Sequence, residues 1–183
     1  MSKNLVSFDW AMKKLLRSKA NFGILEGFLS ELLKQEIKIL NLLESESNKE
    51  DRNDKQNRVD VLVQVQNGEI VLIEVQVNTE LDYLQRMLYG TSKIVSEYLN
   101  EGDAYKQVKK VYSVNILYFS LGHGQDYVYH GTTKFIGIHH QDELALTTTQ
   151  KEIYKKERIH QIYPEYYLIK VNEFNDIAKD TLD

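Results

Sequence analysis

Asp60, Glu74 and Gln76 are the side chains of this sequence best suited to metal-dependent chemistry, with the two carboxylates as the metal ligands. They lie within RVDVLVQVQNGEIVLIEVQV, residues 58–77, where polar residues interrupt two runs of alternating aliphatic residues. Two carboxylates that face each other repel unless a cation lies between them. Mg²⁺ is the simplest cation for that position, because it binds oxygen ligands and often takes only one or two carboxylates, with water and phosphate oxygens completing its coordination.

The alternation predicts a β-hairpin that brings these side chains together. Its two apolar rows are Val59, Val61, Val63 and Val65, then Val71, Ile73, Val75 and Val77. If both rows face one core, paired residues must both be odd or both be even, because a slip of one residue turns a strand over. The shortest loop with that parity is Gln66-Asn67-Gly68, with Gly68 in the left-handed conformation as a G1 bulge. Asp60 then lies directly opposite Glu74, and Gln76 follows on the same face.

A metal ion bound by these carboxylates would suit phosphodiester hydrolysis. Such an ion lowers the pKa of a bound water and neutralises the charge that develops on the phosphoryl oxygens. The competing interpretation is that acids near strand ends are simply solvated. Glu74 favours the metal site, since it lies between Ile73 and Val75 in the middle of an apolar strand, where an unpaired carboxylate is seldom buried.

Composition sets the class of protein. The 183 residues are 42% hydrophobic and 27% charged, which is ordinary for a globular protein, and the length suits one domain, residues 1–183. There is no cysteine, so disulfides and thiolate chemistry are excluded. The net charge of −4 does not indicate a nucleic-acid surface, so any DNA-binding patch must be local.

No segment approaches the length of a membrane span. The N-terminal stretch FDWAMKKLLRSK is apolar on one face only and carries charges throughout, unlike a signal peptide or an anchor. We therefore expect a cytoplasmic protein without a membrane association.

The hydrophobic pattern predicts a mixed α/β order. Helices are expected over residues 8–17, 22–34 and 81–100, strands over 36–44, 59–65, 69–77, 111–120 and 166–171, a solvated loop over 45–57, and a further hairpin of 127–130 with 135–139 around Gly131. Helices are thus followed by three strands, a helix and a strand.

Two stripes run along the helix expected over residues 81–100. The apolar stripe, expected to face the core, consists of Leu81, Leu84, Leu88, Thr91, Val95 and Tyr98. The polar stripe holds Asp82, Arg86, Tyr89 and Lys93. Because the helix begins a few residues after the hairpin, Arg86, Tyr89 and Lys93 are candidates for contacting DNA phosphate, Arg86 in a bidentate manner. A plain solvated helix face is the alternative.

Other polar residues give weaker signals. The five histidines lack the spacing of a zinc site, and we expect them to be satisfied by hydrogen bonds. Two local basic clusters could contact phosphates but are more typical of solvated faces; they are Lys106, Lys109 and Lys110, and Lys151, Lys155, Lys156 and Arg158.

Four segments in order resemble the recombination-promoting nuclease (Rpn) family, also described as PD-(D/E)XK family transposases. They are FDWAMKKLL…ILEGFLSELL, RVDVLVQVQNGEIVLIEVQV, RMLYGTSKIVSEYL and VYSVNILYFS, and the tail segment YYLIKVNEF is similar as well. The resemblance implies a restriction-endonuclease-like αβββαβ core, a central mixed sheet flanked by helices, with extra strands toward the C-terminus. It also implies a metal-dependent DNA endonuclease associated with recombination and mobile elements in bacteria.

The resemblance implies roles for individual residues. Asp60 and Glu74 would be metal ligands, and Gln76 lies where the superfamily usually has a lysine. Glu26 would be an additional acid from the preceding helix, although a surface position suits it equally. A glutamine can orient a water but brings no positive charge, so that charge would come from the metal or from cations of the helix that follows. Glutamine at this place is usual in Rpn-like sequences.

Two functions remain open at this point. The first is a Mg²⁺-dependent DNA endonuclease. The second is a non-catalytic nuclease-fold module that binds DNA or a protein partner, suggested by Gln76 and by the net acidity. A homodimer would be the simplest arrangement for cutting both strands with one site per chain. Family members tend to be longer and the sequence ends soon after its last expected strand, so we expect a C-terminal truncation.

Overall fold

The computed structural model describes residues 16, 18–43, 60–99 and 102–173. Its elements are η1 (Lys19–Asn21), α2 (Phe22–Leu33), β1 (Ile39–Leu42), β2 (Val61–Val65), β3 (Ile70–Gln76), α3 (Tyr83–Glu97), η3 (Tyr105–Gln107), β4 (Val111–Leu117), β5 (Val128–Gly131), α4 (Thr148–Tyr154), η4 (Ile159–Gln161), β6 (Glu165–Lys170) and η5 (Val171–Glu173). Apart from Leu16, the helix expected over 8–17 lies outside the described residues, as does the loop expected over 45–57.

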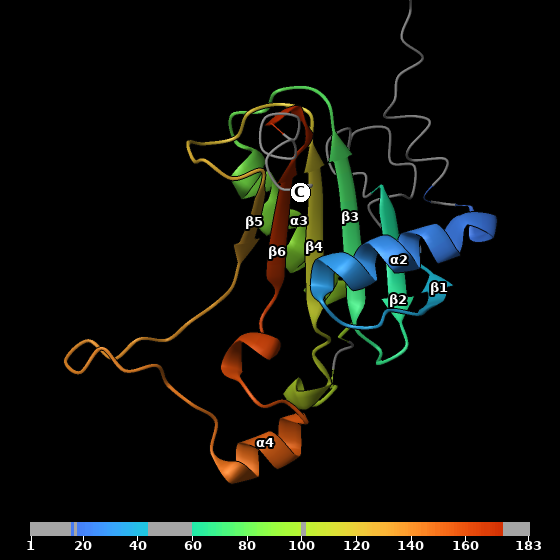
Figure 1. Ribbon diagram of the computed structural model, residues 1–183. Coiled ribbons are helices and arrows are strands. Elements are labelled where there is room, and N and C mark those ends of the chain that lie inside the picture. Colours follow the sequence, from blue (N-terminus) through green and yellow to red (C-terminus); the bar gives the residue numbers. More distant parts are fainter. Residues whose placement is uncertain (1–15, 17, 44–59, 100–101, 174–183) are drawn as a thin grey trace, which may run out of the picture.

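The strands form one mixed sheet between two helices. Their order is β1-β2-β3-β4-β6-β5, with β3, β4 and β6 parallel to one another and the other neighbours antiparallel. Helix α2 covers one face, and α3 covers the other (Figure 1). This arrangement confirms the expected fold class, a restriction-endonuclease-like sheet flanked by helices. None of the described helices is long and apolar enough to cross a membrane.

The hairpin of β2 and β3 has the register that parity predicts. The pairs run from Val61 with Ile73 to Gln64 with Ile70. The loop closes through hydrogen bonds from Val65 N to Glu69 O (3.0 Å) and from Gly68 N to Val65 O (2.8 Å). Gly68 has a φ of 81°, the left-handed conformation that favours glycine in a G1 bulge. One more step of this register sets Asp60 opposite Glu74.

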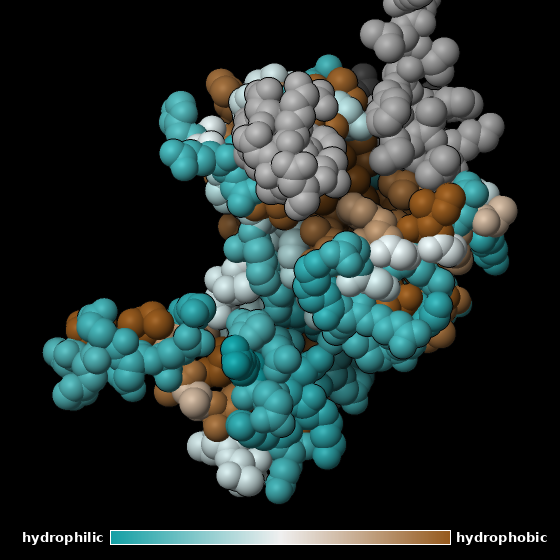
Figure 2. Space-filling view, viewed as in Figure 1, coloured by the Kyte–Doolittle hydropathy of each residue, from teal (hydrophilic) through white to brown (hydrophobic). Residues whose placement is uncertain are grey.

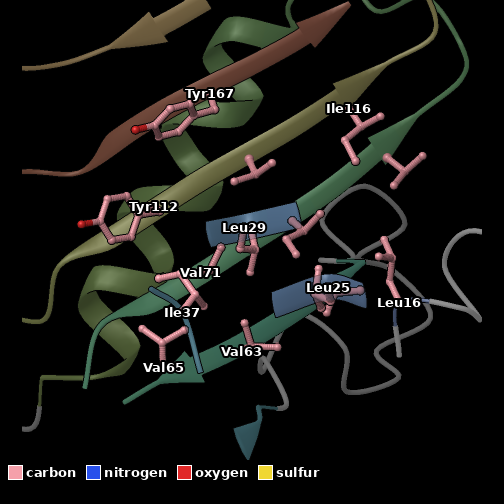
Figure 3. Packing of buried hydrophobic residues seen from close by; sticks show 14 residues of the cluster. Leu16, Leu25, Leu29, Ile37, Val63, Val65, Val71, Tyr112, Ile116 and Tyr167 are labelled. Atoms are coloured by element: carbon pink, nitrogen blue, oxygen red, sulfur yellow. The ribbon is translucent and has the colours of Figure 1, made fainter. Parts of the chain in front are cut away.

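Both faces of the hairpin are buried, whereas the sequence pattern assigned only the odd-numbered face to the core. The odd-numbered residues pack with Leu25 and Leu29 of α2 (Figure 3). Leu62, Ile70 and Leu72 pack on the other face with Ile94 of α3. A strand covered by helices on both sides is largely apolar on both. On the even face the buried carboxylates lie at the end near Glu74, and Gln64, at the other end, is only half-buried.

Helix α3 is turned differently from the expected orientation. Leu81, Leu84 and Leu88 are 95%, 51% and 58% exposed, while Tyr83, Thr91 and Ile94 are buried. The prediction is wrong for the N-terminal half of the stripe and right for Thr91 in the C-terminal half. The reason is that the sheet presents polar side chains opposite the first turns of α3, and these accept a tyrosine hydroxyl better than leucine side chains.

The prediction of a hairpin around Gly131 is also wrong. β5 pairs antiparallel with β6, and residues 135–139 make only an isolated bridge between Ile136 and Glu143. The chain instead leaves the sheet as a projecting arm before α4 (Figure 1). The arm shows hydrophilic and hydrophobic atoms side by side (Figure 2). The strand expected over 166–171 is confirmed as β6.

Candidate active site

Asp60 and Glu74 lie at one end of the β2–β3 hairpin, on the face that α3 covers. Both are almost completely buried, with exposed fractions of 7% and 6%. Asp60 Oδ2 accepts a hydrogen bond of 2.6 Å from the backbone N–H of Val75, which holds the aspartate against β3. A charged hydrogen bond of this length fixes the orientation of a carboxylate. The two acids are therefore held close together by the sheet itself.

The environment of Glu74 disfavours its charged form. Burial raises the pKa of Glu74 to about 7, with a further rise from the charge of Asp60 and an opposing effect from the nearby Arg86. Helix α3 passes close to this carboxylate, since a Cβ at Gly90 would lie 3.6 Å from Glu74 Oε1. A carboxyl with this pKa is only partly ionised at neutral pH. A nearby cation lowers the free-energy cost of ionising it.

Arg86 and Glu80 form an ion pair beside Glu74. Arg86 Nη1 donates to both oxygens of Glu80, at 2.7 and 2.9 Å, while Arg86 Nε lies 3.7 Å from Glu74 Oε2. Gln76 Nε2 donates to the same Glu80 Oε1 at 2.6 Å. Glu80 thus links the glutamine of β3 to the arginine of α3.

Tyr83 and Asn115 form the inner wall of the site. The Tyr83 hydroxyl donates to Asn115 Oδ1 at 2.9 Å and lies 3.4 Å from Glu74 Oε2; its single proton favours the shorter contact. Asn115 neighbours Glu74 on the adjacent parallel strand. Its amide group is fixed by Ser113 and by the carbonyl of Tyr167. Burial and the charge of Glu74 raise the pKa of Tyr83, which keeps the hydroxyl protonated as a donor.

A comparison with models of protein families shows to which family this chain belongs. The family model described as PD-(D/E)XK nuclease family transposase matches residues 6–163. The chain belongs to this family. Searches of curated proteins and of solved structures gave no match. The family assignment carries a nuclease-type function, and PD-(D/E)XK nucleases generally use divalent cations.

The structure does not bring Glu26 together with Asp60 and Glu74, and this favours the alternative that Glu26 is no part of a metal site. Glu26 lies on α2, where its Oε1 accepts from the backbone N–H of Ile39 at 2.8 Å and its Oε2 lies 3.6 Å from Lys38 Nζ. Helix α2 packs on the face of the sheet opposite to that of Glu74. Glu26 fastens β1 to α2 instead.

The acidic donors of this site suit a cation that needs few protein ligands. Among the residues that the structure describes, no three His, Asp or Glu side chains gather closely enough to hold a metal ion. Asp60 and Glu74 remain as a pair of oxygen donors, the set that Mg²⁺ accepts when water and phosphate complete its coordination. The residues therefore fit a magnesium-like ion and do not fit a closed structural metal cage.

Three residues of the site were missed from the sequence: Glu80, Tyr83 and Asn115. Asn115 gave a signal, since it is the amide within the otherwise largely apolar VYSVNIL of β4. Glu80 gave none, because it precedes α3 and no periodicity marks it. Of the expected phosphate contacts, Arg86 lies within the site. Tyr89 and Lys93 lie on later turns of α3, with Tyr89 56% exposed, and their contact with DNA stays a prediction.

Proposed function

We propose that this member of the PD-(D/E)XK nuclease family is a metal-dependent DNA endonuclease that hydrolyses phosphodiester bonds. The observation that carries the proposal is the pairing of two buried carboxylates, Asp60 and Glu74, at one end of the β2–β3 hairpin. Two such acids on one face repel each other when both are charged, and a bound cation removes that repulsion. Family membership supports DNA as the substrate.

Asp60 and Glu74 would hold the divalent cation, most simply Mg²⁺. When bound, the cation supplies an activated water and neutralises charge on the phosphoryl oxygens. The Val75 N–H fixes Asp60, and Tyr83 lies against Glu74 from α3. The carboxylates therefore keep their places before a substrate arrives, which is what preorganised catalysis needs.

Gln76 and Arg86 would act on the substrate side. Gln76 has a side-chain amide that donates and accepts hydrogen bonds and can orient a water, although it brings no charge. Arg86 brings a permanent positive charge on a planar group that matches a phosphate. Together they would cover the two tasks that a lysine at position 76 performs in most of the superfamily.

A non-catalytic module that binds DNA or a protein partner is the second candidate. It is supported by the hydrogen bond of Gln76 to Glu80, which occupies the amide with a structural contact. The wider setting is part of the proposal as well: a role in bacterial recombination or mobile elements, a cytoplasmic location, and a homodimer for double-strand cutting.

The test is nicking of a supercoiled plasmid by the purified chain, with Mg²⁺ or with EDTA. We expect nicking that requires Mg²⁺ and is lost in Glu74→Gln. The matched control is Glu152→Gln, which removes an exposed glutamate of α4. Nicking that persists in Glu74→Gln would identify a contaminant. DNA binding without nicking in any divalent cation would favour the non-catalytic module.

A further inference from the structure

Arg86 lies between the two glutamates of the candidate site. Its Nη1 contacts both oxygens of Glu80, and its Nε faces Glu74 Oε2 at 3.7 Å. The guanidinium also lies 5.9 Å from the centre of the Tyr83 ring. One positive charge thus serves two acids, with Asp60 next to them as a third.

The hold of Arg86 on Glu74 is poor. Within the described part of the chain, Arg86 Nε is buried and has no hydrogen-bond partner, because 3.7 Å is too long for a hydrogen bond. A buried N–H without a partner is costly, and a guanidinium can make two parallel bonds to a carboxylate that it does not make here. Arg86 therefore binds Glu80 through two hydrogen bonds, whereas it attracts Glu74 by charge alone.

We propose that Arg86 is the internal counter-ion of Glu74, that a divalent cation displaces it, and that the released guanidinium binds the DNA phosphate. This inference rests on the proposed metal-dependent function. Two cations beside one carboxylate repel each other strongly at short range and low dielectric, so Arg86 and a metal ion compete for Glu74.

The position of Arg86 allows this movement. It lies in the first turn of α3, with its side chain 22% exposed, and the residues just before the helix are largely exposed. Moving it needs no shift of α3, because the tightly packed residues of the helix are Tyr83, Thr91 and Ile94. Glu80, to which Arg86 is bound, has a side chain that is 29% exposed and can move with it.

Glu80 couples Arg86 to Gln76. Gln76 Nε2 and Arg86 Nη1 both donate to Glu80 Oε1, at 2.6 and 2.7 Å. The positive charge that a lysine would bring at position 76 is thus present as Arg86, tethered beside the glutamine through one oxygen. This coupling explains how a glutamine can stand in that place.

The experiment measures binding of Mn²⁺ by calorimetry, in the absence of DNA. We compare the wild type with Arg86→Met, which removes the charge and keeps the length, and with Glu74→Gln, which removes the site. The matched control is Lys93→Gln, which removes a positive charge from the same helix two turns further on. If Arg86 competes with the metal, Arg86→Met binds Mn²⁺ at least about tenfold more tightly than the wild type, whereas Lys93→Gln is unchanged.

The outcomes separate the inference from the proposed function. Glu74-dependent binding in the wild type that is equal or weaker in Arg86→Met overturns the counter-ion and leaves the metal site standing. Absence of Mn²⁺ binding in every variant overturns both. Should Arg86→Met fail to fold, the Nε–H resonance of Arg86 in wild-type NMR spectra decides: Mg²⁺ must shift it strongly, and an unchanged resonance in a protein that binds Mg²⁺ contradicts displacement.

Discussion

Lys110 Nζ lies 2.7 Å from Glu165 Oε1, and only 4% and 5% of these two residues is exposed. The pair joins the beginnings of β4 and β6, at the opposite end of the sheet from Glu74. Lys110 also donates to the carbonyl oxygens of His160 and Tyr163, which fastens η4 to the sheet. The sequence pattern suggests that Lys110 belongs to a surface cluster; it is instead a buried structural residue.

Lys110→Met should destabilise the protein strongly. The variant removes the charged partner of the buried Glu165 and the donor to two carbonyl groups, a loss of about 3–5 kcal/mol. Urea unfolding measures the free energy of unfolding. Lys106→Met, at an exposed position, is the control and should change it by less than about 0.5 kcal/mol. Equal effects of the two substitutions would contradict a structural role for Lys110.

The Glu165 carboxyl predicts a loss of stability in acid. Burial acts to raise its pKa, but the hydrogen bond and charge of Lys110, with hydrogen bonds from His130 and His160, hold the pKa of Glu165 below its ordinary value of 4.5. A carboxyl whose pKa is lowered by folding stabilises the native protein at pH values above 4.5. This stabilisation is lost as the pH falls through the pKa of the native state. The stability difference between wild type and Glu165→Gln should therefore be constant near pH 7 and shrink below about pH 4.5. Unfolding curves at several pH values measure it, and a difference that does not change in acid would contradict the ion pair.

The hairpin shows what a sequence can establish about this fold. Its register follows from two conditions: two aliphatic rows that share one core permit only pairings of equal parity, and the shortest loop of that parity places Gly68 at its one left-handed position. The amino-acid pattern by itself therefore predicts that Asp60 lies opposite Glu74. Their binding of a metal stays a prediction, because register does not determine chemistry.

The predictions from sequence that proved wrong have a common physical cause, which is contact between residues that lie far apart in the sequence. The leucines at the start of α3 fit a helical stripe, but Asn115, 32 residues after Tyr83, decides which face turns inward. β5 pairs with β6 instead of with the residues that follow Gly131. Lys110 is buried because Glu165 lies 55 residues later. Periodicity reports local amphipathicity and carries no information about such partners.

Glu74 should show the opposite pH dependence to Glu165. Its pKa is raised to about 7 by burial, so folding is favoured while the carboxyl is protonated, and that advantage is lost as the pH rises from 4.5 through 7. In EDTA, the wild type should lose stability relative to Glu74→Gln over this interval, by at most about 3 kcal/mol. Denaturant unfolding at pH 4.5, 6 and 8 measures the difference. A constant difference would show that folding does not change the pKa of Glu74, which contradicts the effect of burial.

Gly90→Ala should separate the stability of α3 from the chemistry of the site. Alanine is favoured over glycine within a helix by about 1 kcal/mol, and the new Cβ has room, since its nearest contact is Glu74 Oε1 at 3.6 Å. The methyl group excludes water from that oxygen, so it should raise the pKa of Glu74 further and weaken divalent-cation binding at pH 7.

Gly27→Ala is the matched control for that substitution. Gly27 lies within α2, and a Cβ there meets nothing within 4 Å, so the variant should gain a similar helical stability with no effect on the site. Thermal unfolding and calorimetric titration with Mn²⁺ measure the two properties separately. If Gly90→Ala and Gly27→Ala bind Mn²⁺ equally well, a methyl group 3.6 Å from Glu74 Oε1 does not weaken cation binding, which contradicts this prediction.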